Sequence, residues 1–241
     1  YDPDAQRLQD RLLPPNSEYL LGTDQFGRDI LSRILLGARV SLVVGVGGTG
    51  VALIAGGFLG ATAGYLGGWI DEALMRTMDI IMAFPYIVLA ISLVVLLGPS
   101  MINLISIIGI LRVPRFSRVM RSSVLSTKEK DFVLAATAIG QRPIWIVFRH
   151  ILPNCLAPTL VMASMSMATA ISAEAALSFL GIGIQPPRSS WGMMLADGRR
   201  YMLSGWWIST FSGLALSLTI LGYNLVGDGL RDALDPRTRH S

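Results

Sequence analysis

The chain has 241 residues, of which 52% are hydrophobic and 15% are charged, and its mean hydropathy is +0.55. Because soluble domains carry about 25% charged residues, this composition excludes an ordinary soluble domain and favours a membrane protein. The net charge of +4 comes from basic residues at the edges of apolar stretches, without the aromatic interleaving of a nucleic-acid groove, so no nucleic-acid partner is expected. The single cysteine excludes an internal disulfide.

Long stretches of the chain are free of charge. Asp, Glu, Lys and Arg are absent from 40–70, 80–111 and 201–227, and Glu174 is the only charge within 151–187. A helix needs roughly 20 apolar residues to cross a bilayer, so each stretch can span it. A turn at 98–100 divides the second stretch. The sequence therefore predicts an all-α polytopic membrane bundle with five spans, at 40–65, 74–97, 101–120, 158–180 and 207–227.

The distribution of positive charge predicts the orientation. Short loops rich in Lys and Arg favour the cytoplasm. Such residues crowd the chain after the third span and recur in the C-terminal tail, at Arg112, Arg115, Arg118, Arg121, Lys128, Lys130, Arg142, Arg149, Arg231, Arg237 and Arg239. We therefore expect a multi-pass protein of the plasma or inner membrane with this loop and the C-terminus in the cytoplasm. The arginine-containing N-terminal segment would then lie outside, so we also expect a sixth, N-terminal span ahead of Tyr1 that is missing from this sequence.

This topology predicts three regions. Residues 1–38 form an extracytoplasmic connector, with an amphipathic interfacial helix at 24–37. Residues 39–228 form the transmembrane domain, which includes a cytoplasmic loop at 121–153, and residues 229–241 form a cytoplasmic tail. Since few apolar residues precede Arg112 in the third span, we expect this span to project beyond the lipid, with its arginines at the interface.

Two features within the spans suggest close helix contacts or a transport role. Gly56, Gly60, Gly64 and Gly68 recur every four residues, which predicts a helix face that lets a second span or a partner subunit approach closely. Glu174 is a carboxylate inside a span, which is costly. It is a residue of the pathway or its gate, a packing anchor hydrogen-bonded to a neighbouring helix, or a group hydrated near the outer boundary, and the sequence leaves these interpretations open.

The loop at 121–153 is the most informative segment. Residues 130–139 can form a short helix that Gly140 ends, and Pro143 suits the start of a second helix. Ala135 and Ala136 would present a nearly flat surface that allows a partner to approach closely. The alternative is an amphipathic helix on anionic lipid, with Trp145 inserted. The residues alone do not separate the two interpretations.

The loop also resembles a known family. Ala135 and Ala136, followed by Gly140 and later by Leu152 and Pro153, resemble the loop by which binding-protein-dependent ABC importer permeases dock on their ATPase. Three longer phrases are similar to the C-type permease subunit of dipeptide, oligopeptide and nickel importers: LGTDQFGRDILSRILLGARVSLVVG at 21–45, AEAALSFLGIGIQPPRSSWGMMLADGRRYM at 173–202 and GDGLRDALDP at 227–236. One departure is Leu134, which stands where the family often has Glu and removes a possible salt bridge to the ATPase.

The resemblance implies a type I ABC importer transmembrane domain that forms half of a pathway for di- or oligopeptides. It implies three kinds of partner: a second homologous permease, two cytoplasmic ATPases and an extracytoplasmic substrate-binding protein. No catalytic residue, metal site or cofactor is expected in this chain, and ATP and Mg²⁺ would bind to the ATPases. The implied ATPase-coupling residues are Leu134, Ala135, Ala136, Gly140, Leu152 and Pro153. Alternatives are the same machinery carrying nickel chelates or another small solute, and a passive channel or membrane scaffold.

Overall fold

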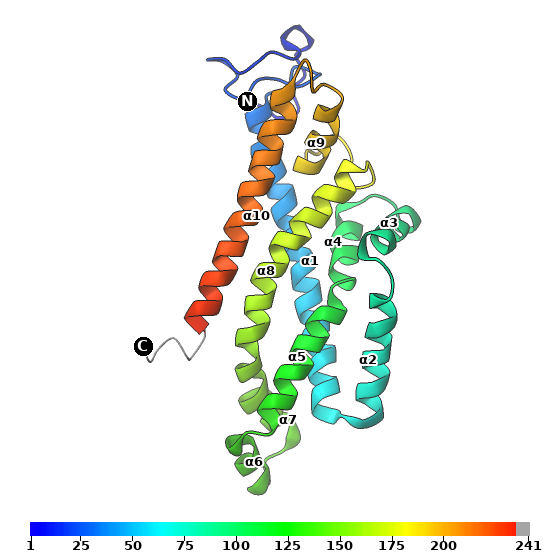
Figure 1. The fold of residues 1–241 in the computed structure, drawn as a ribbon, viewed down its shortest axis with the longest axis vertical. Coiled ribbons are helices and arrows are strands. Elements are labelled where there is room, and N and C mark those ends of the chain that lie inside the picture. The colour runs from blue at the N-terminus through cyan, green and yellow to red at the C-terminus, as the bar shows by residue number, and fades with distance from the viewer. Residues whose placement is uncertain (235–241) are drawn as a thin grey trace.

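The structure is a computed structural model that describes residues 1–234, and these residues form an elongated helical bundle (Figure 1). A 3₁₀ turn, Leu8–Asp10, precedes the helices, and a π-helical turn, Val147–Ile151, joins α7 to α8. The α-helices are α1 (Ile30–Leu66), α2 (Gly68–Met82), α3 (Tyr86–Leu97), α4 (Met101–Ile110), α5 (Val113–Lys128), α6 (Asp131–Ala138), α7 (Pro143–Ile146), α8 (Leu152–Phe179), α9 (Trp191–Arg199) and α10 (Trp206–Leu234).

The bundle has two distinct ends. Figure 1 shows α6 and α7 at the bottom, which we call the loop end, and the N-terminal segment with α9 at the top, which we call the N-terminal end. Helices α1, α5 and α8 pack side by side in the centre, with α10 and α2 on opposite sides of them. The expectation of an all-helical membrane bundle is confirmed.

Three of the five predicted spans are single long helices. Within the described residues, α1, the continuous segment Pro143–Phe179 and α10 are long and apolar enough to cross a bilayer. They correspond to the first, fourth and fifth predicted spans. Helix α4, which begins the third, has only 10 residues, and it continues into α5 after a turn at Leu111 and Arg112.

The span predicted at 74–97 is formed by two helices and is sharply bent. Helices α2 and α3 meet at an angle of 87°, with a break between them. The cause is Pro85, because a proline disfavours helical geometry in the preceding residue, here Phe84. The turn predicted at 98–100 is confirmed, since Gly98 ends α3 with a φ of +83° and Ser100 caps α4.

The amphipathic helix predicted at 24–37 is wrong. The side chain of Asp29 caps a helix that starts at Ile30, since its carboxylate accepts the Ser32 N–H at 2.8 Å. From there α1 continues without a break to Leu66, so the predicted boundary at 38/39 falls inside a helix. The boundary at 228/229 likewise falls inside α10, and residues 235–241 of the predicted tail lie outside the described residues.

The N-terminal segment folds over the N-terminal end of the bundle. The indole N–H of Trp207 donates to the carbonyl oxygen of Thr23 at 3.0 Å, and that of Trp191 donates to the carbonyl oxygen of Ile34 at 3.0 Å. Both tryptophans belong to a buried apolar cluster together with Ile30 and Ile171. Residues far apart in sequence therefore close this end of the bundle.

The glycine repeat forms the contact between α1 and α5. A methyl group at Gly56 would lie 2.8 Å from the carbonyl oxygen of Val113, and one at Gly60 would overlap the carbonyl oxygen of Ser117. Gly64 faces Val124 in the same way, so three of the four predicted packing glycines contact α5 of the same chain. Gly68 is different: it starts α2 with a φ of +56°, and a methyl group there would have no atom of this chain within 4 Å, so it does not pack on α5.

We expect Gly60→Ala to destabilise the protein by about 1 to 3 kcal/mol, because the added methyl group forces α1 away from α5. Gly50→Ala is the matched control, since Gly50 lies in the same helix and a methyl group there would have no atom within 4 Å. The measurement is the thermal unfolding midpoint of the purified permease in mild detergent. Equal midpoints for the two variants would show that the close approach of α1 and α5 does not limit stability.

Candidate functional site

The loop at the loop end contains the predicted short helix, observed as α6, and the predicted glycine turn. Helix α6 ends in a Schellman motif: the N–H of Gly140 donates to the carbonyl oxygen of Thr137 at 3.0 Å, and the N–H of Gln141 donates to that of Ala136 at 3.1 Å. Gly140 has a φ of +74°, a conformation that other residues rarely adopt. This turn sends the chain back toward the bundle, where Pro143 starts α7.

The two alanines of α6 have different environments. Ala136 is 5% exposed and packs with Val133 against Val124 of α5 and Ile146 of α7. Ala135 is exposed. The expectation that the two alanines together form one flat docking surface is therefore wrong for Ala136, because the helical turn directs it into the protein. Ala136 anchors the loop, and Ala135 faces outward.

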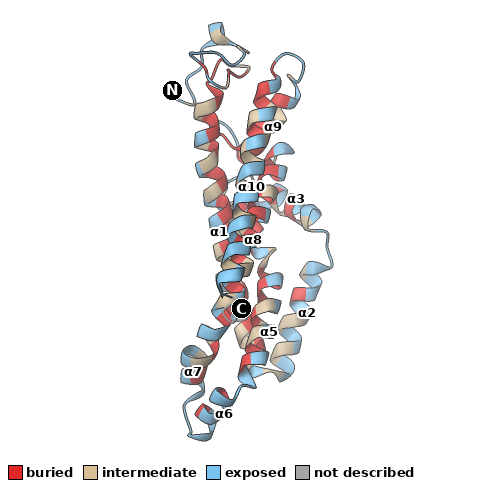
Figure 2. Cartoon of the chain, turned by 60° about the vertical axis from the view of Figure 1, so that its left-hand side comes forward, coloured by how far each residue is buried: buried red, intermediate tan, exposed pale blue. Residues whose placement is uncertain are grey.

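Apolar side chains dominate the outward face of the loop. Figure 2 shows α6 and α7 as largely exposed, in contrast to the buried residues of the central helices. The exposed apolar surface of the loop, which we call the loop surface, consists of Leu134, Ala135, Ile139, Ile144, Trp145 and Phe148. A patch of this kind at one end of a bundle indicates a binding surface, either for a protein or for lipid.

Polar contacts hold the loop against the ends of neighbouring helices. The Lys128 ammonium group donates to the carbonyl oxygen of Tyr65 at 2.9 Å and lies over the Tyr65 ring. The His150 imidazole and the side-chain oxygen of Gln141 are 3.0 Å apart, which connects the start of the second helix to the turn after α6. The Arg121 guanidinium binds both carboxylate oxygens of Asp71, so α2 is also fixed to α5 near this end.

Leu152 and Pro153 lie where the loop joins the membrane-spanning part. Leu152 is half-buried against the same apolar cluster as Ala136, whereas Pro153 is exposed. The π-helical turn before them makes α7 and α8 one continuous helical segment. The predicted loop therefore ends inside a helical segment in which α7 and α8 are continuous.

Glu174 lies far from the loop, between α1 and α8, and is 0% exposed. Its two carboxylate oxygens accept hydrogen bonds from the Ser41 hydroxyl at 3.0 Å and the Ser178 hydroxyl at 2.7 Å. Because both oxygens have donors and the side chain has no exposure, the geometry favours the packing anchor over the pathway or gate. Within the described residues, no group of three or more His, Cys, Asp and Glu side chains could hold a metal ion.

The bundle and its loop correspond to a known family. The family described as binding-protein-dependent transport system inner membrane component matches residues 56–240. The chain belongs to this family. It is a multi-pass membrane permease subunit of an ABC importer, a machine that also contains ATPase and further permease subunits.

Individual relatives extend the match to almost the whole chain. The dipeptide transport system permease protein DppC of Alkalihalophilus pseudofirmus is 50% identical over 229 residues, which cover 95% of this chain and 75% of the relative. The di/tripeptide transport system permease protein DppC of Pseudomonas aeruginosa is 42% identical over 247 residues, which cover 100% of this chain and 82% of the relative.

A solved structure supports the architecture. A chain from the structure titled "Inward facing conformations of the MetNI methionine ABC transporter" superposes with a TM-score of 0.64 at 19% identity, over 86% of this chain and 96% of that chain. At this identity the likeness concerns the fold alone. The predicted fold of a type I ABC importer transmembrane domain is confirmed.

We expect Gly140→Ala to strain the turn after α6 by about 1 to 2 kcal/mol, since a residue with a side chain is disfavoured at positive φ. Gly140→Asn should have a smaller effect, because asparagine tolerates this region. Hydrogen exchange of the α6 amides in the purified permease measures the difference. Unchanged exchange in Gly140→Ala would show that the Schellman turn does not hold α6 in place.

Ser41→Ala should lower stability by about 1 to 3 kcal/mol, because it leaves one oxygen of a fully buried carboxylate without its donor. The matched control is Ser172→Ala, since the Ser172 hydroxyl donates only to the carbonyl oxygen of Ala168 in its own helix. Thermal unfolding in detergent compares the two. An equal loss for both variants would refute the role of Glu174 as an anchor between α1 and α8.

Proposed function

We propose that this permease forms half of the translocation pathway of a peptide importer and that its loop surface is the docking site for a cytoplasmic ATPase. The other half would come from a second homologous permease subunit. Two ATPases, with ATP and Mg²⁺ bound to them, would supply the energy, and an extracytoplasmic substrate-binding protein would deliver the cargo. Membership of the importer family supports this composition.

The observation that carries the proposal is the construction of the loop. Its inner face, with Val133 and Ala136, is packed on α5 and α7, while its outer face is apolar and exposed. A partner that pushes or pulls the outer face would therefore move α5, and it would move α8 through α7. This is what coupling requires, because an ATP-driven motion outside the membrane must reach the spans. In this scheme Leu134 and Ala135 contact the ATPase, and Gly140, Ala136, Leu152 and Pro153 keep the loop in position.

The charge distribution supports the orientation. Basic residues gather at the loop end, among them Arg121, Lys128, Lys130, Arg142 and Arg149. We place this end, and the C-terminus after α10, in the cytoplasm, as short basic loops favour that side. The N-terminal segment and α9 then lie outside, where they would meet the binding protein.

The relatives support peptides as the cargo. The names of the two permeases described above refer to dipeptides and to di- or tripeptides. Neither name favours the nickel alternative. We therefore assign short peptides to this importer, with selectivity resting largely with the binding protein.

A bulky charge on the outer face of the loop tests the coupling role. Ala135→Glu should lower both ATPase binding and peptide uptake by at least about tenfold, since an unpaired charge would be buried at the contact. The measurements are co-purification of the ATPases with the tagged permease and uptake of a radiolabelled dipeptide by proteoliposomes of the full complex.

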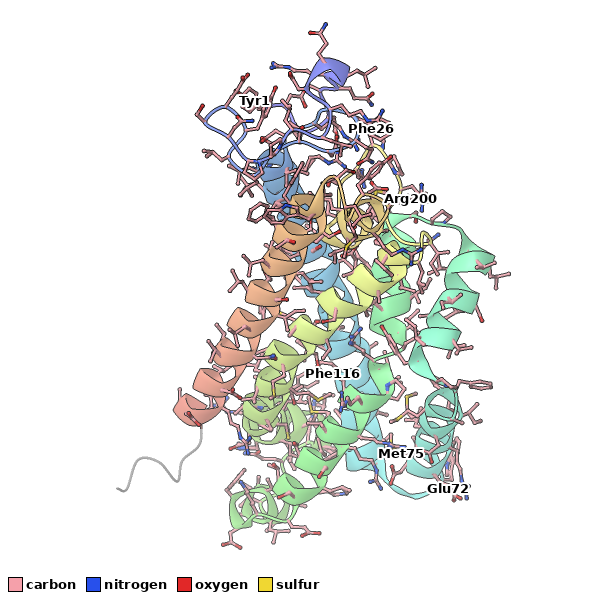
Figure 3. All side chains as sticks on the ribbon, turned by 45° about the horizontal axis from the view of Figure 1, so that its top comes forward. Tyr1, Phe26, Glu72, Met75, Phe116 and Arg200 are labelled. Carbon is pink, nitrogen blue, oxygen red and sulfur yellow. The ribbon has the colours of Figure 1, made fainter. Side chains whose placement is uncertain are left out.

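The control variant is Glu72→Lys, which also changes charge near the loop end but outside the loop (Figure 3). Glu72 is exposed, and among the residues that the structure describes its ion pair is with Arg76, at 3.7 Å in the same helix. It should leave both measurements near the wild-type values. If Ala135→Glu behaves like this control, the loop surface does not bind the ATPase, and a lipid-facing role for the loop becomes the better interpretation.

A further inference from the structure

Arg112 lies in the interior of the membrane-spanning part, not at the interface, where we expected the arginines of the third predicted span to lie. In the chain it stands between Gly109, which packs against Gly48 and Val51 of α1, and Phe116, which packs with Ala52. Arg112 is therefore level with the middle of the uncharged stretch 40–65 of α1. The helical rise from Met101, the first residue of α4, to Arg112 is roughly 16 Å. This distance is about half of a 30 Å hydrocarbon core, so it places Arg112 at the same depth.

Neutral groups hold the Arg112 guanidinium at this depth. It donates to the Tyr86 hydroxyl at 2.9 Å, the Thr169 hydroxyl at 3.2 Å and the carbonyl oxygen of Ile108 at 3.3 Å, and it also lies over the Tyr86 ring. None of the ion pairs between described residues includes Arg112. The side chain is thus positioned by hydrogen bonds while its charge is not neutralised by a carboxylate.

An unneutralised guanidinium at this depth destabilises the folded protein unless an anion lies beside it. A charged group in the bilayer interior normally faces a cavity or a partner, and it marks a site of function. Lipid phosphates cannot supply the anion, because they lie at the interface, about 15 Å from the bilayer centre. The counter-charge must therefore come from a molecule that enters the bundle or from a subunit that contacts it.

The structure has a cavity at this point. A space of about 390 Å³ is lined by Arg112 and Arg115 together with Phe84, Tyr86, Pro114 and Thr169. This volume falls in the range of small-ligand pockets, about 300 to 1,000 Å³. A second cavity of about 470 Å³ shares Arg115 and Thr169 with the first and extends to Arg231 of α10.

Two helix breaks that fall within predicted spans border the first cavity. The break between α2 and α3 contributes Phe84 and Tyr86, and the break between α4 and α5 contributes Arg112 and Pro114. Irregular backbone at membrane depth is tolerated where it is buried or lines a water-filled cavity. The two helix breaks and Arg112 therefore border the same cavity.

We propose that Arg112 binds the C-terminal carboxylate of the peptide cargo midway through the membrane. Tyr86 and Thr169 position the guanidinium, and the apolar wall formed by Phe84 and its neighbours accommodates the peptide side chains. Arg115, on the next turn and shared by both cavities, offers the carboxylate a second cation on the side nearer the loop end. This inference rests on the proposed function, because it requires a cargo with a carboxylate.

The test uses the complete importer, with both permeases, its ATPases and its binding protein, in proteoliposomes. The probe is alanyl-photoleucine, a dipeptide with a photoreactive diazirine on its C-terminal residue. Illumination during turnover should label residues of α3, α5 and α8 that line the cavity. In Arg112→Gln, uptake and this labelling should both fall at least about tenfold, while ATP hydrolysis stimulated by the loaded binding protein is retained.

The matched control is Arg118→Gln on the same helix. Arg118 forms an exposed ion pair with Asp79 at 2.6 Å and lines neither cavity. Uptake should stay within about twofold of wild type, because Arg118 does not border the space in which the peptide would bind. Tyr86→Phe, which keeps the charge but removes one acceptor from the guanidinium, should give a partial loss of uptake between those of the control and Arg112→Gln.

Three results would overturn the proposal. The first is wild-type uptake in Arg112→Gln. The second is labelling of the wild-type complex away from the cavity, a readout that does not depend on whether any variant folds. The third is loss of the second permease from the Arg112→Gln complex but not from Arg112→Lys, since the charge would then serve the contact between subunits. Absence of peptide uptake by the wild-type complex is a separate outcome that refutes the assignment of peptide cargo, and with it this inference.

Discussion

The close contact between α1 and α5 is the constraint on which the other features depend. Gly56, Gly60 and Gly64 remove the side chains that would keep the two backbones apart, so α5 lies directly on α1 along its length. The C-terminal part of α5 contributes to the apolar cluster that anchors α6. Arg112 immediately precedes the N-terminus of α5. Helix α5 therefore connects the loop surface with the cavity beside Arg112, as the proposed coupling requires.

Glu174 and Arg112 are two charged groups inside the bundle, and their surroundings differ. Glu174 is surrounded by hydroxyl donors from α1 and α8, which makes a buried carboxylate tolerable and connects two helices. Arg112 has acceptors but no carboxylate among the ion pairs of the described residues. In sequence, Glu174 is a single charge within an apolar stretch, whereas Arg112 is the first of several basic residues that follow such a stretch. In the structure, both carboxylate oxygens of Glu174 accept hydrogen bonds, whereas the Arg112 guanidinium faces a cavity.

Much of the candidate site could be predicted from sequence because its signals are local. The glycine that ends α6 and the proline that starts α7 act within a few residues. The division between Ala135 and Ala136 could not be predicted, since it depends on which face of α6 meets Val124 and Ile146, residues on other helices. The contacts of His150 with Gln141 and of Lys128 with Tyr65 were missed for the same reason. No local sequence pattern predicts them.

The sequence by itself determined that the chain is a helical membrane protein, where its long apolar helices lie and which helix face carries the glycines. These properties follow from composition, from the length needed to cross a bilayer and from the helical repeat. Only the tertiary structure decided that Pro85 turns one expected span through 87°, that the glycines meet α5 of the same chain, and that Arg112 lies at mid-depth beside a cavity. Depth and contact depend on how separate helices are placed against each other, and a pattern read along one helix does not contain that information.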